Sequence, residues 1–85
     1  MIDPVAAALA VGSREELATF LVDLAQRARS GQTPIENETS PDMIEAAAYW
    51  TEGMDDFLRV RGEDVSSLSP WSIVALIFSA GLVYE

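Results

Sequence analysis

Two long stretches of the chain repeat apolar residues at intervals of three and four, the spacing of one face of an α-helix. The first stretch covers about residues 14–30. Its apolar face consists of Leu17, Phe20, Leu21, Leu24 and Ala28, and its other face of Glu15, Glu16, Thr19, Asp23 and Gln26. This separation predicts an amphipathic helix that packs one face on a core.

The second stretch, about residues 41–61, predicts a longer helix with the same kind of pattern. Its apolar positions are Met43, Ala47, Trp50, Met54, Phe57 and Leu58. Opposite them lie four acids and a tyrosine: Asp42, Glu45, Tyr49, Glu52 and Asp56. The pattern therefore predicts a buried stripe on one side and an acidic outer face on the other.

The third helical segment, about residues 70–80, is apolar nearly all the way round. A helix without a polar face is buried on several sides or lies in an interface, so we expect it at the centre of the fold. The end of the chain, Leu82–Tyr84, is expected to pack back on the core, with at most a short strand contact. Trp50 and Trp71 are both expected in the core.

Capping residues predict where the helices begin and end. Starts are indicated by Asp3-Pro4, which opens a short helix to about Val11, by the Ser13/Glu16 capping box, and by Ser40-Pro41 and Ser69-Pro70. Stops are indicated by Gly31, Gly62 and Gly81, with Arg27, Arg29, Arg59 and Arg61 in last turns. Together the patterns predict an all-α fold, one compact domain over residues 1–85 with about four helices and a central apolar C-terminal helix.

The composition removes most of the groups on which enzymes depend. The 85 residues include no histidine, cysteine or lysine, so the usual general base, thiol nucleophile and Schiff-base former are missing. Thiolate and Glu-x-x-His metal sites are excluded for the same reason. The adjacent acids Asp55-Asp56 and Glu63-Asp64 diverge around a helix instead of converging on one ion. We therefore predict a protein that is not an enzyme and has no cofactor and no metal.

Negative charge is concentrated in the middle of the chain. Residues 32–64 hold nine acids and two arginines, a net charge of -7 out of -9 for the whole chain. Nucleic-acid phosphates and anionic membranes would be repelled, whereas a basic protein would be attracted. The start of the chain lacks the basic residues of a secretory signal, and the C-terminal apolar run is shorter than a membrane span. The expectation is a cytoplasmic protein.

The acidic face has two interpretations. Acids on a helix face are most often solvated surface, but an aromatic residue among charges is typical of a binding surface. The second interpretation assigns partner binding to Asp42, Glu45, Tyr49, Glu52 and Asp56. Nearby, Asn37 is expected to cap its own turn.

The order of landmarks resembles an uncharacterised bacterial family of small acidic proteins, a domain of unknown function. The matching positions are Phe20, Glu36-Asn37, Trp50, Pro70-Trp71 and Tyr84-Glu85, which together cover about residues 13–85. One departure is Ile35, where members of the family usually have a tryptophan before Glu-Asn. The resemblance implies no activity, and the family is similar to immunity and antitoxin proteins only in general character.

These observations lead to one expected function and two alternatives. We expect a small acidic protein-binding module, an inhibitor or immunity/antitoxin-type protein that neutralises a basic partner protein. The alternatives are a phage-type inhibitor (anti-CRISPR-like, or a mimic of nucleic acid) and a housekeeping helical domain without inhibitory role. A homodimer through the apolar C-terminal helix is a further interpretation of that segment.

Overall fold

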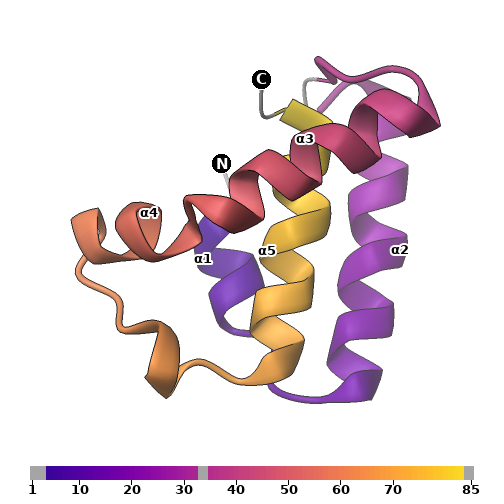
Figure 1. Cartoon of the computed structure of the whole chain (residues 1–85). Helices are drawn as coiled ribbons and strands as arrows, with labels where there is room; N and C mark the ends of the chain where they lie inside the picture. Colours follow the sequence, from indigo (N-terminus) through magenta and orange to yellow (C-terminus); the bar gives the residue numbers. More distant parts are fainter. Residues whose placement is uncertain (1–3, 33–34, 84–85) are drawn as a thin grey trace.

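The structure, a computed structural model, describes residues 4–32 and 35–83. Within them it contains five α-helices and a short 3-10 helix, and no strand (Figure 1). The elements are α1 (Pro4–Leu9), α2 (Arg14–Ser30), α3 (Ser40–Glu52), α4 (Met54–Val60), η1 (Val65–Ser67) and α5 (Pro70–Val83). The all-α prediction is therefore confirmed. The strand contact considered near the C-terminus is wrong for residues 82 and 83, which are helical, and Tyr84 lies outside the described residues.

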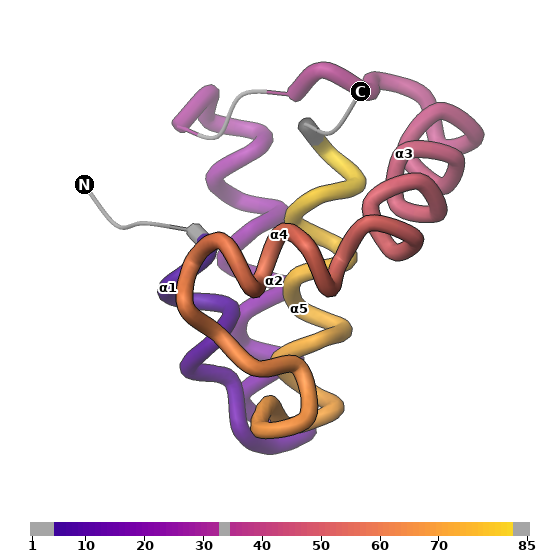
Figure 2. The backbone as a smooth tube through the Cα atoms, turned by 60° about the vertical axis from the view of Figure 1, so that its left-hand side comes forward, coloured from indigo at the N-terminus to yellow at the C-terminus, as the bar shows by residue number. Residues whose placement is uncertain are grey.

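The apolar C-terminal helix is the centre of the fold, as its sequence predicts. Helices α1, α2 and α3 all pack against α5, and α2 and α5 run side by side in the same direction (Figures 1 and 2). The buried core cluster consists of Ala8, Val11, Leu17, Trp50, Leu58, Ala75 and Leu76. The radius of gyration is 12.3 Å, close to the roughly 12 Å expected of one compact domain of this length. Within the described residues, no helix combines the length and the apolarity needed to cross a bilayer.

The predicted ends of α2 are confirmed in atomic detail. The Ser13 hydroxyl accepts a hydrogen bond from the N–H of Glu16 at 3.1 Å. The Glu16 carboxylate in turn accepts the N–H of Gly12 at 2.7 Å, so the reciprocal bond of the capping box reaches one residue further back. At the other end Gly31 has a φ of 80°, the left-handed conformation that a residue with a side chain rarely adopts.

The single helix predicted over residues 41–61 is wrong, because the chain breaks it into α3 and α4 at Gly53. Glycine has the lowest helix propensity after proline, and a Cβ at Gly53 would meet no atom within 4 Å, so no close contact requires glycine there. The apolar period nevertheless continues across the break, where the rings of Trp50 and Phe57 meet edge to face at 5.5 Å. The start also differs by one residue. Thr39, not Ser40, is the N-cap, and its hydroxyl accepts the N–H of Asp42 at 3.3 Å.

Two predictions about α5 need correction. Gly81 does not end the helix, which continues to Val83. It is buried against α3 instead, and a Cβ at this position would lie 3.2 Å from both Cγ and the carbonyl oxygen of Met43. Glycine is therefore favoured here by the close approach of two helices, not by a left-handed turn. Trp71, expected in the core, is 36% exposed, whereas Trp50 is 5% exposed as predicted.

Candidate functional site

The outer side of α3 carries the predicted acidic surface. Asp42, Glu45, Tyr49 and Glu52 are spaced three, four and three residues apart, so they form one stripe along the helix. All four are exposed, Tyr49 to 53%. Ala46 and Trp50, on the inner side, are each only 5% exposed and hold the helix on the core. We call these four residues the acidic face.

The carboxylates of the acidic face are not neutralised within the fold. Among the described residues, Asp42, Glu45 and Glu52 form no ion pair with an arginine. Three of the arginines pair with other acids, as in the pair between Arg27 and Asp23 on α2 at 2.8 Å. The acidic face therefore presents uncompensated negative charge around an accessible aromatic ring.

Asp56, the fifth predicted site residue, differs from the other four. It lies on α4, beyond the break at Gly53, and its carboxylate forms an exposed ion pair with Arg59. The structure thus brings four of the predicted residues onto one helix and places the fifth on another. The sequence pattern did not reveal this separation, because the apolar residues keep the same helical spacing on both sides of the break at Gly53.

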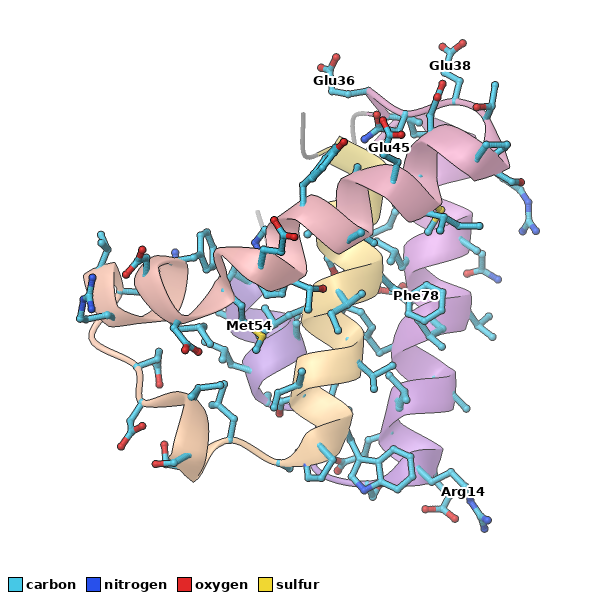
Figure 3. The ribbon with its side chains drawn as sticks, viewed as in Figure 1. Arg14, Glu36, Glu38, Glu45, Met54 and Phe78 are labelled. Carbon is cyan, nitrogen blue, oxygen red and sulfur yellow. The ribbon has the colours of Figure 1, made fainter. Side chains whose placement is uncertain are left out.

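Two acids that were not predicted as site residues extend the acidic face. Glu36 and Glu38 project outward from the loop before α3, at the same end of the molecule as Glu45 (Figure 3). Both side chains are exposed. They raise the number of acids at this end of α3, and because they lie in a loop outside any helical period, no sequence signal places them there.

Asn37 holds this loop against the end of α5. Its side-chain amide donates to the carbonyl oxygen of Gly81 at 3.0 Å. The backbone N–H groups of Glu36 and Asn37 both donate to the carbonyl oxygen of Leu82, at 2.9 and 3.0 Å. We expected only a local role for Asn37, and the bond to a helix 44 residues away was missed. These contacts fix the position of the two additional acids relative to α3.

Asp64 lies apart from the acidic face and has a structural role. Its carboxylate accepts hydrogen bonds from the hydroxyl and the backbone N–H of Ser66, at 2.8 and 3.0 Å. These bonds favour the charged form and hold the pKa of Asp64 below its usual value. The carboxylate therefore caps η1 and is engaged in that turn.

No arrangement suited to metal chemistry is present in the described parts of the chain. With histidine and cysteine absent from the sequence, carboxylates are the charged side chains left as ligands. Over residues 4–32 and 35–83, no three of them gather closely enough to hold an ion. The acids of α3 form a row along a convex helix, which is a geometry for contact with a surface.

Comparison with known proteins places the chain in a family. A model described as a family of unknown function (DUF7660) matches residues 13–85. The chain belongs to this family. No curated protein and no solved structure gives a significant match. The DUF7660 match covers α2 to α5 and the whole acidic face, whereas α1 precedes it. The sequence-based resemblance to a domain of unknown function is thereby confirmed, and DUF7660 brings no activity with it.

Proposed function

We propose that this protein is a binding module that neutralises a basic partner protein through the acidic face of α3. The observation that carries the proposal is the row of three unpaired carboxylates around the exposed ring of Tyr49. An inhibitor of the immunity or antitoxin type, acting in the cytoplasm on a basic toxin, is the most specific form of the proposal.

Binding would proceed in two physical stages. The net charge of -9 steers a basic partner toward the molecule, and the uncompensated acids of α3 orient it. Glu36 and Glu38 widen the attracting surface at the start of the helix. Tyr49 then supplies an amphipathic anchor whose burial slows dissociation.

A second candidate function uses the same row of carboxylates. Acids at regular helical spacing could occupy a basic groove that otherwise holds nucleic-acid phosphates, as in a phage-type inhibitor. The two candidates differ in one measurable property. A phosphate mimic competes with DNA or RNA for its partner, whereas an inhibitor that binds elsewhere on a basic protein does not.

The test begins with a pull-down from the native host to identify the partner, followed by association and dissociation rates over a range of salt. Glu45→Arg with Glu52→Arg should slow association about tenfold or more and flatten its salt dependence. Tyr49→Ala should mainly raise the dissociation rate. The matched control is Asp55→Arg with Asp56→Arg on α4, which makes the same charge change away from the acidic face.

The control separates a specific site from general attraction. If both double variants slow association equally, net charge alone explains binding and α3 has no special role. If neither changes it, the interface lies elsewhere on the molecule.

A further inference from the structure

One flank of α2 carries small and apolar residues that the fold does not cover. Ala18 and Val22 are exposed, Val22 to 59%, and Ala25 is half-buried. The core stripe of the same helix, Leu17 and Leu24, points elsewhere and is buried. The flank therefore belongs to the surface, and Val22 is its large exposed apolar side chain.

The spacing along this flank is that of a coiled-coil seam. Glu15, Val22 and Arg29 are seven residues apart, with Ala18 and Ala25 at the intermediate positions. A heptad with small residues at the seam allows two helices to approach closely. We call these five residues the α2 seam.

The α2 seam is complementary to itself. Val22 lies at the midpoint of α2 (Arg14–Ser30), with an acid one heptad before it and a base one heptad after it. When a second copy packs antiparallel against it, Val22 meets Val22 of the second copy and Glu15 meets Arg29 at both ends. A parallel arrangement would place like charges opposite each other.

We propose that the protein forms a homodimer through the α2 seam, with the two-fold axis at Val22. This is an isologous interface, in which the same surface is used by both copies. Phe78 on α5 is a second exposed apolar side chain of the molecule, 42% exposed (Figure 3). This interface uses α2, whereas a dimer through α5 would use the helix on which α1, α2 and α3 already pack.

The charges at both ends of the seam are free to pair with a second copy. Within the described residues, Arg29 forms no ion pair, and Glu15 pairs only with its neighbour Arg14, at 3.2 Å on the open surface. Such exposed pairs are weak and easily exchanged. The acidic face lies on α3, outside the seam, so each copy keeps it available.

The first test is the mass of the full-length chain by sedimentation equilibrium from micromolar to about half-millimolar protein. We expect a transition from 9.2 kDa to twice that mass. Val22→Glu brings two carboxylates together at the axis and should weaken the dimer roughly a hundredfold or more. Val60→Glu, the same change at an exposed valine on α4, should leave the dimer intact and shows what added charge does by itself.

The second test identifies the orientation. Glu15→Arg and Arg29→Glu should each weaken the dimer, by about tenfold because each change affects two symmetric pairs. The double variant restores the pairs in reverse and should recover the original affinity. In addition, because the chain has no cysteine, Val22→Cys offers a single thiol at the axis that should form a covalent dimer on oxidation, whereas Val60→Cys should not.

Several results would overturn the proposal. A chain that stays at 9.2 kDa over the whole concentration range has no such interface. A dimer that tolerates Val22→Glu, or that fails to recover in the double charge swap, uses another surface. Circular dichroism of each variant checks that a lower average mass reflects dissociation of the dimer and not unfolding of the chain.

Discussion

The side-chain amide of Asn37 donates a hydrogen bond to the carbonyl oxygen of Gly81, 3.0 Å away. Two backbone N–H groups of the same loop donate to the next carbonyl oxygen, that of Leu82. The last turn of a helix leaves its carbonyl groups without partners inside the helix. The loop before α3 satisfies two of them, which ties the most acidic part of the chain to the end of its central helix.

Removal of this amide should destabilise the fold. For Asn37→Ala we expect a loss of about 1 kcal/mol in the free energy of unfolding, the usual contribution of one intramolecular hydrogen bond. Glu38→Ala, an exposed change one residue away, should cost close to nothing. Urea denaturation of both variants measures the difference, and equal stabilities would mean that the Asn37 bond contributes nothing net.

The two glycines at 53 and 81 should respond oppositely to alanine. At Gly81 the new methyl group would lie 3.2 Å from the backbone of Met43, so α3 and α5 must separate. We expect a loss of about 1–3 kcal/mol, as for other overpacked sites. At Gly53 φ is −95°, and an added Cβ would meet no atom within 4 Å. Alanine there should be neutral or should stabilise the fold by up to about 1 kcal/mol. Thermal unfolding of Gly81→Ala and Gly53→Ala tests whether the first lowers the melting temperature and the second leaves it unchanged or raises it.

These glycines also show how far the sequence alone determines the fold. Capping signals depend on a few adjacent residues, so the start of α2 at Ser13 and its end at Gly31 were predicted correctly. A glycine after an apolar run is equally consistent with a helix end and with a close helix contact. Only the position of Met43 on another helix distinguishes the two at Gly81.

The candidate site was predictable to the extent that it lies on one helix. Asp42, Glu45, Tyr49 and Glu52 share a face by spacing alone, and the structure keeps them together. The contribution of the loop acids could not be predicted, because it depends on a hydrogen bond between segments far apart in sequence. Such contacts leave no periodic signal.

A buried serine connects the start of α5 to the end of α1. Ser72 is 2% exposed, and its hydroxyl lies 2.6 Å from the carbonyl oxygen of Val11 and 3.0 Å from that of Leu9. Ser72→Ala leaves these carbonyl groups without that donor and should cost about 1–3 kcal/mol. Ser79→Ala is the matched control, since the Ser79 hydroxyl only bonds the carbonyl of Ala75 within its own helix. A similar loss in both variants would show that the link to α1 adds nothing.

The carboxylate of Asp64 should give stability that depends on pH. Its pKa is lower in the folded chain than the ordinary value of 3.8, because the Ser66 hydroxyl and N–H bond the charged form. Because the pKa is lowered by folding, the stabilisation is complete at pH values above the pKa of Asp64 in the unfolded chain. It is lost as the pH falls through the lower pKa of Asp64 in the folded chain. The melting temperature of Asp64→Ala should therefore be below that of the natural chain at pH 6–7, and the gap should narrow below about pH 3. If the difference in melting temperature between Asp64→Ala and the natural chain stays constant with pH, the stabilisation by Asp64 does not depend on its negative charge.

Although α1 precedes the region matched by the family model, it is part of the core. Ala8 is fully buried, and Ala6 on the same short helix is exposed. Leucine has the same effect on helix propensity at both positions, so the two substitutions differ only in packing. Ala8→Leu should cost about 1–3 kcal/mol by overpacking against α5, and Ala6→Leu should change stability by less than about 0.5 kcal/mol. Guanidinium denaturation measures both. If Ala8→Leu is tolerated as well as Ala6→Leu, α1 is not firmly packed on α5, and the hydrogen bonds of Ser72 to the carbonyl oxygens of Leu9 and Val11 do not hold it there.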